Sequence, residues 1–78
     1  MLINEIVIDE NNMAFIPSLG ISYQLNETAK EIINLIKEGR KKDEIVDIIS
    51  SKSGVDWREV FIDVEDFFAK LKIYGLIQ

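Results

Sequence analysis

The spacing of the apolar residues changes once along this chain, close to residue 25. Up to that point, β-branched and alternating side chains are typical of short strands, as in the segment from Ile21 to Leu25. From residue 26 onwards, apolar residues recur every three or four positions, which is the spacing of one helix face. Because 78 residues suffice for one domain only, we expect a single α+β domain over residues 1–78, with a sheet in 1–25 and helices in 26–78.

We expect three short strands in the first part of the chain. Residues 3–8 are rich in β-branched side chains, and residues 13–16 are again apolar after the turn-forming residues 9–12, which predicts a hairpin. Residues 17–20 contain the single proline and separate this hairpin from a third strand, residues 21–25. Alternation puts the apolar side chains of the third strand on one face and its polar ones on the other: Ile21, Tyr23 and Leu25 against Ser22 and Gln24.

Three helices are expected at about residues 27–38, 42–52 and 57–73. Asn26 and Asp56 are good N-cap residues for the first and third, since their side chains can accept hydrogen bonds from the first helical turn. The predicted architecture is winged-helix-like, with a three-stranded antiparallel sheet followed by a three-helix bundle. Seven apolar residues of the third helix are predicted to form its buried face: Trp57, Val60, Phe61, Val64, Phe67, Phe68 and Leu71.

The chain contains neither cysteine nor histidine. This excludes a disulfide framework, a thiolate nucleophile, a thiol zinc site and any catalytic triad that uses an imidazole. The sequence also lacks a glycine-rich phosphate loop and an EF-hand loop. We therefore expect no enzymatic activity, no metal and no cofactor.

The charge balance disfavours nucleic acid as a partner. Nine Lys and Arg residues stand against fourteen Asp and Glu residues, which gives 9 − 14 = −5. Binding of DNA depends on cations that neutralise phosphates, and the third predicted helix is itself more acidic than basic. The first five residues lack the basic and apolar regions of a signal peptide, and no apolar run approaches the length of a membrane span. We expect a cytoplasmic protein with no membrane contact.

Two features could bind a partner chain. The third strand contains no charged residue to protect its edge, so its backbone could pair with an extended peptide, unless the strand is central or its edge is covered by a helix. The third helix has a second apolar stripe, which could form the wall of a shallow groove or could pack on the strands. The candidate contact residues on this stripe are Ile62, Ala69 and Ile73, with Arg58 beside them for a peptide carboxylate.

Several short motifs follow one another along the chain: Tyr23-x-Leu25-Asn26-x-Thr28-Ala29-x-x-Ile32, Gly39, Glu44-Ile45, Ile48-Ile49, Val60-x-x-Asp63-Val64-x-x-Phe67-x-x-x-Leu71 and Gly75-Leu76-Ile77. In order and spacing they resemble those of the PqqD family, which is named for pyrroloquinoline quinone (PQQ) biosynthesis. The family is also called the recognition element of ribosomally synthesised and post-translationally modified peptides. The similarity covers about residues 21–78, and one departure is Lys41, where the family often has Thr or Ser as a helix cap.

The resemblance implies a non-catalytic domain of three strands and three helices that binds the leader of a precursor peptide. In such proteins the leader adds a strand beside the third strand, here residues 21–25, in a cleft next to the third helix. The implied partner is a modifying enzyme, such as a radical SAM protein, a protease or a cyclase. Two copies could also pair through the edge strand or exchange hairpins. The alternative functions are a winged-helix regulator, a small dimerising interaction domain or an accessory domain of a larger enzyme.

Overall fold

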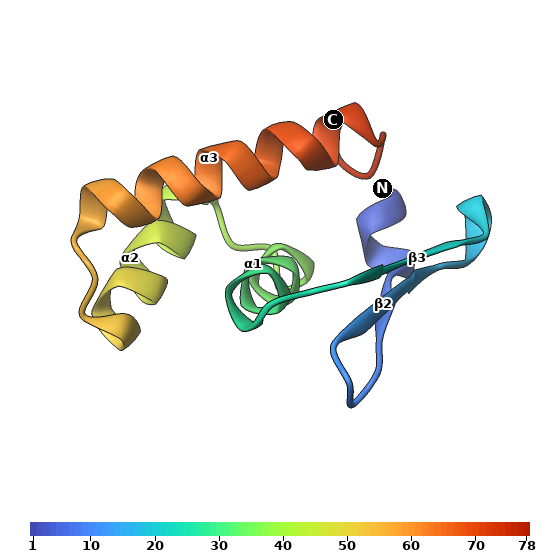
Figure 1. Cartoon of the computed structure of the whole chain (residues 1–78). Helices are drawn as coiled ribbons and strands as arrows, with labels where there is room; N and C mark the ends of the chain where they lie inside the picture. Colours follow the sequence, from blue (N-terminus) through green and yellow to red (C-terminus); the bar gives the residue numbers. More distant parts are fainter.

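The computed structural model describes all 78 residues and confirms an α+β fold with a three-stranded sheet followed by three helices (Figure 1). The three helices confirm the sequence-based bounds to within one residue or so. No helix has both the length and the apolar character that crossing a bilayer requires. The elements are the 3₁₀ turn η1 (Leu2–Glu5), β1 (Val7–Ile8), β2 (Met13–Ile16), the 3₁₀ turn η2 (Pro17–Leu19), β3 (Ile21–Gln24), α1 (Glu27–Lys37), α2 (Lys42–Ser53) and α3 (Trp57–Ile73).

The sheet is antiparallel in the order β1-β2-β3, so β3 has a neighbour on one side only. The β1–β2 turn is fixed by Asp9, whose Oδ1 accepts hydrogen bonds from the backbone N–H groups of Asn11 and Met13, both at 2.9 Å. Asn12 takes a left-handed φ of 62°, which Asn tolerates better than most residues. The predicted hairpin is confirmed, and β3 is an edge strand rather than a central one.

The prediction of a strand over residues 3–8 is wrong in its first half. Residues 2–5 form η1, and only Val7 and Ile8 pair with β2. Ile3 and Ile6 are both buried, and a spacing of three residues places two side chains on the same side of a 3₁₀ turn but on opposite faces of a strand. The backbone N–H of Ile3 donates to the carbonyl of Leu76 at 3.0 Å, which joins the two ends of the chain.

The helix starts follow from local capping. Asn26 Oδ1 accepts from the N–H of Ala29 at 2.7 Å, and Asp56 Oδ1 accepts from the N–H of Arg58 at 2.8 Å. The second helix begins at Lys41 without a Ser or Thr cap. There the side chain of Glu44 accepts from the N–H of Lys41 at 3.0 Å, which satisfies one backbone donor and replaces half of a capping box.

The buried face of α3 is narrower than predicted. Val60, Val64 and Leu71 are buried, whereas Trp57 and Phe61 are 42% and 38% exposed. These two rings stack on one another with centroids 5.2 Å apart, beside the face of α3 that Val60 and Val64 bury. The indole N–H of Trp57 donates to a carboxylate of α2, so a polar contact adds to the buried contacts of Val60 and Val64 at this end of α3.

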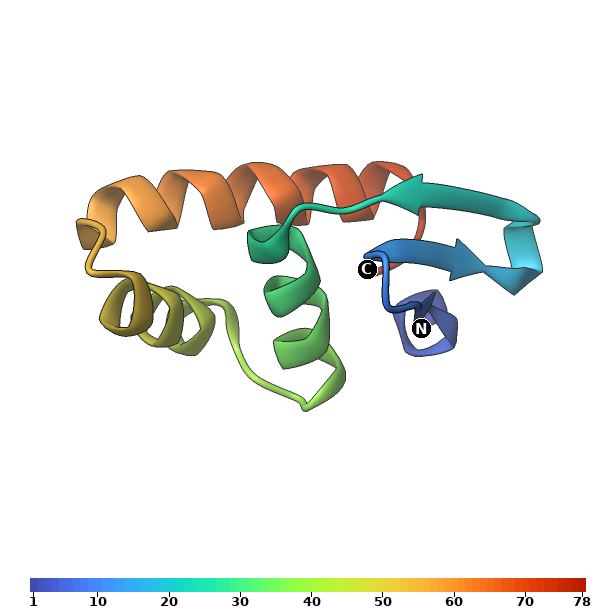
Figure 2. The same cartoon turned by 60° about the horizontal axis from the view of Figure 1, so that its bottom comes forward.

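The core consists of two apolar clusters, and α1 contributes buried residues to both of them. One joins η1, the sheet, α1 and the C-terminal residues, and the other joins α1, α2 and the first half of α3. The long helix α3 contributes to both, with Val64 in the second cluster and Leu71 in the first. β3 and the C-terminal half of α3 therefore border the same cluster, Tyr23 from the strand and Leu71 from the helix, and the chain then turns from β3 into α1 (Figure 2).

Candidate functional site

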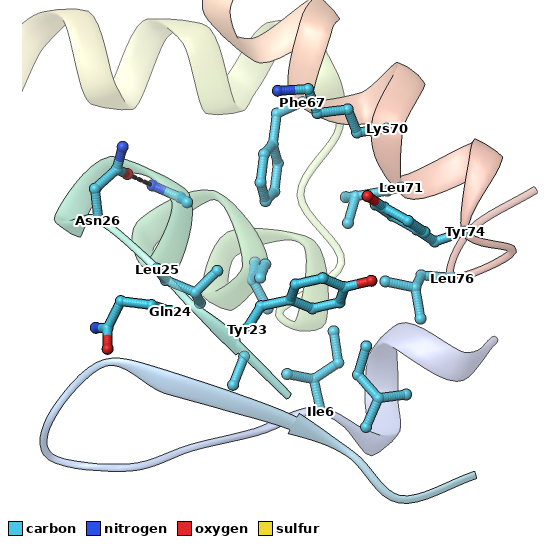
Figure 3. A pocket seen from close by; sticks show the side chains of 14 residues that line it. Ile6, Tyr23, Gln24, Leu25, Asn26, Phe67, Lys70, Leu71, Tyr74 and Leu76 are labelled. Carbon is cyan, nitrogen blue, oxygen red and sulfur yellow. Dashed lines mark hydrogen bonds between the residues drawn. The ribbon is translucent and has the colours of Figure 1, made fainter. Parts of the chain in front are cut away.

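An apolar cleft of about 330 Å³ lies between β3 and the C-terminal half of α3 (Figure 3). Tyr23, Gln24 and Leu25 line it from one side. The residues that line it from α3 and its end are Phe67, Lys70, Leu71 and Tyr74. Core residues of the sheet, α1 and the C-terminus, among them Ala14, Ile33 and Leu76, form its floor. Eleven of the fourteen lining residues are hydrophobic, so the cleft suits apolar groups.

The backbone of β3 has hydrogen-bonding groups free on the side away from β2. The N–H of Leu25 donates to the carbonyl of Asn12 at 2.9 Å, which fixes the phase of the antiparallel ladder. Because hydrogen-bonded pairs alternate along such a ladder, Tyr23 and Ile21 bond to β2. The N–H and C=O groups of Ser22 and Gln24 therefore point to the open edge. None of the backbone hydrogen bonds outside helices and strands engages these groups.

The open edge has none of the features that commonly prevent strand pairing. Residues 21–24 contain no charged side chain and no proline, and the register with β2 is continuous, without a bulge. Gln24 is held in place by its side-chain amide, which donates to the carbonyl of Asn11 at 2.8 Å. A regular, unprotected edge beside an apolar cleft is suited to accept an extended peptide.

Two tyrosines meet across the cleft. The rings of Tyr23 on β3 and Tyr74 at the end of α3 have centroids 5.4 Å apart and an interplanar angle of 42° (Figure 3). Partial desolvation, together with the neighbouring Tyr74 hydroxyl, raises the pKa of Tyr23 above its ordinary value of 10.0. The Tyr23 phenol, which is neutral at physiological pH even at its ordinary pKa, therefore ionises only in more strongly alkaline solution.

Lys70 is the one charged residue among those that line the cleft. It has no carboxylate within 4.0 Å, unlike Lys42 and Lys52, which form ion pairs elsewhere in the domain. A second hollow, also of about 330 Å³, continues from the cleft past the start of α1, and Asp63 and Asp66 line it together with Lys70. The residues that line the cleft are therefore neutral along β3, whereas those at the end of the cleft near α1 are charged.

The sequence-predicted contact residues divide into two groups. Tyr23, Gln24 and Leu25 line the cleft, and the backbone of Ser22 lies on the open edge, whereas Ile21 starts the strand and is partly exposed. The four residues predicted on the third helix do not line the cleft and are exposed on another side of α3: Arg58, Ile62, Ala69 and Ile73.

On α3, the predicted contact residues and the residues that line the cleft lie on different faces of the helix. At about 100° per residue, the predicted stripe is rotated roughly 130° from the face that carries Phe67, Lys70 and Tyr74. Lys70 and Tyr74 were missed, although their spacing of four residues put them on one face together with Phe67. The sequence could group the residues of each face, but the choice between faces required the position of β3.

Comparison with known proteins places this chain in a family. The model of the family described as coenzyme PQQ synthesis protein D (PqqD) matches residues 6–77. The chain belongs to the PqqD family. The match confirms the resemblance found in the sequence motifs and extends it over the N-terminal strands of this PqqD-family domain. A comparison with curated protein sequences found no significant match.

A solved structure has the same fold as this PqqD-family domain. It is described as lasso peptide synthetase B1 complexed with the leader peptide, and its TM-score is 0.78 at 20% sequence identity. The alignment covers 90% of this chain and 84% of the synthetase chain. At this level of identity, the likeness shows that the two chains share a fold.

Proposed function

We propose that this PqqD-family chain binds the leader of a ribosomally made precursor peptide as an additional strand along β3. The observation that carries the proposal is the open edge at Ser22 and Gln24 beside the apolar cleft. The family membership and the leader-peptide complex of a protein with this fold support the proposal. Cleft and edge offer backbone donors, acceptors and apolar surface, so the domain acts as a recognition element and leaves catalysis to a partner enzyme.

The energetics require both the edge and the cleft. Ser22 and Gln24 each offer one donor and one acceptor, and each hydrogen bond contributes a net stabilisation of about 1 kcal/mol. The combined free energy of four such bonds only about equals the lower estimates of the free-energy cost of association, which comes from lost translational and rotational freedom. Affinity must therefore come from apolar side chains of the peptide that enter the cleft, each of which contributes about 1.5–3 kcal/mol when it is fully buried.

The modifying partner that we propose belongs to the enzyme classes that serve this family, a radical SAM protein, a protease or a cyclase. Its surface meets the peptide-loaded domain in the cytoplasm. A gene for a short peptide beside genes for such an enzyme and for this chain supports this assignment. A neighbouring operator with metabolic genes instead points to a regulator.

The direct test is titration of the isotopically labelled domain with the synthetic leader of a neighbouring precursor, followed by amide NMR and hydrogen exchange. We expect chemical-shift changes along β3 and the cleft face of α3, and slower exchange of the Ser22 and Gln24 amides, which become hydrogen-bonded. A scrambled peptide of the same composition is the control. Shifts confined to other surfaces, or tight binding of duplex DNA with a steep salt dependence, would contradict the proposal.

Lys70 provides a prediction about charge. We expect Lys70→Ala to weaken binding of a leader with Asp or Glu near the α1 end of the cleft by about two- to fivefold, the range for an exposed ion pair. Calorimetry at low and high salt measures the effect, which should shrink as salt rises. Lys72→Ala removes the same charge from the same helix outside the cleft. An equal loss in both variants would show that net charge alone is responsible.

A further inference from the structure

The geometry of the edge determines which peptide side chain enters the cleft, and this step rests on the proposed function. A strand that bonds to Ser22 and Gln24 has one residue directly opposite Tyr23, between the two bonded positions. Opposite residues of paired strands project their side chains on the same face of the sheet. The side chain opposite Tyr23 therefore projects on the same side as the Tyr23 ring, which lines the cleft.

At that point the side chain meets the pair of tyrosine rings. Tyr74 follows the last residue of α3, and its ring lies 5.4 Å from that of Tyr23 (Figure 3). Leu71 and Phe67 line the same cleft about one and two turns earlier on α3. A dry cavity of about 150 Å³ accommodates a benzene ring. The cleft of about 330 Å³, which the Tyr74 ring lines, can thus hold an aromatic or a large aliphatic side chain beside that ring.

Tyr74 combines a fixed backbone with a side chain that has space to move. Its N–H donates to the carbonyl of Lys70 at 3.0 Å, and the following Gly75 adopts a left-handed φ of 74° that ends the helix. Tyr74 is 48% exposed, so its ring can turn toward solvent without disturbing α3. Tyr23 is more buried and packs against the core, so it is the stationary member of the pair.

We propose that Tyr74 is a specificity-determining residue, whose ring packs against the side chain opposite Tyr23. The peptide class selected is an extended segment with an aromatic or large aliphatic residue at the position opposite Tyr23. The neighbouring peptide residues, opposite Ser22 and Gln24, project on the other face of the sheet and are not selected by the cleft.

The test uses a displayed library of random linear peptides, selected separately on the wild-type chain and on three variants. Tyr74→Ala removes the ring, Tyr74→Phe keeps it without the hydroxyl, and Ile73→Ala truncates a neighbour that is 81% exposed and outside the cleft. Thermal melting verifies that each variant folds. The best wild-type peptide is then synthesised with Ala, Leu or Phe at its common apolar position, and intermolecular NOEs to Tyr23 identify the residue opposite it.

We expect wild type, Tyr74→Phe and Ile73→Ala to prefer Leu or Phe over Ala by about tenfold or more, and Tyr74→Ala to reduce this ratio to about threefold or less. Peptides that bind at β3 with a ratio unaffected by Tyr74→Ala would overturn the role of Tyr74 and leave the proposed function standing. Failure to enrich any peptide, or a domain that pairs through β3 with a second copy and excludes peptides, would overturn both.

Discussion

The Ser22→Pro variant should fold and lose peptide binding by roughly 30-fold or more. The N–H of Ser22 points to the open edge and has no partner within the domain, so proline removes no hydrogen bond of the sheet. In the complex, proline removes one donor, leaves a peptide carbonyl without its partner and places its ring where the added strand lies. A lost bond with an unsatisfied acceptor costs about 2–4 kcal/mol, which gives this factor. Fluorescence anisotropy of a labelled leader measures the affinity.

Two further variants distinguish the contribution of the backbone N–H groups at the β3 edge from that of the Ser22 side chain. Ser22→Val changes the exposed side chain but keeps the N–H, and we expect its affinity to remain within about threefold of wild type. Gln24→Pro repeats the test at the second free position, at the added loss of the side-chain bond to Asn11. If a folded Ser22→Pro domain bound the leader as tightly as Ser22→Val, the peptide would not use the β3 edge.

The parts of the fold that could be predicted are those set by local interactions. Asn26 and Asp56 cap their helices with their own side chains, and Asp9 shapes the hairpin turn, so the sequence near each residue determines the conformation. The bounds of all three helices follow from such contacts. The family motifs agree with this division because they consist mainly of core and capping positions.

The parts that could not be predicted depend on residues far apart in the sequence. Ile3 forms a 3₁₀ turn instead of a strand because it packs beside Leu76, at the other end of the chain. Phe67 and Tyr74 face the cleft, and Ile62 does not, because β3 lies on one particular side of α3. β-branched composition favours a strand at residues 3–8, but tertiary burial of Ile3 and Ile6 outweighs this weak propensity.

The second large effect concerns stability, and we expect Ile3→Ala to lower the free energy of unfolding by about 2–5 kcal/mol. Ile3 is 0% exposed and belongs to the cluster that holds the sheet, α1 and the C-terminal residues together. Truncating a fully buried isoleucine removes apolar contacts and leaves a cavity that the surroundings fill only in part. A domain of this size has about 4–12 kcal/mol of stability in total, so a large share is lost. Urea unfolding followed by circular dichroism measures the change.

Val7→Ala is the matched control, because it shortens a β-branched side chain of β1 that is 58% exposed, and its cost should stay below about 1 kcal/mol. Ile3 lies before residue 6, where the family match begins, so its importance follows from its packing in this structure. The same cluster includes Leu76, which lines the cleft, and a destabilised Ile3→Ala domain should also bind the leader more weakly at temperatures near its melting point. Equal, small losses for both variants would mean that the N-terminal turn is not part of the core and that the cleft floor forms without it.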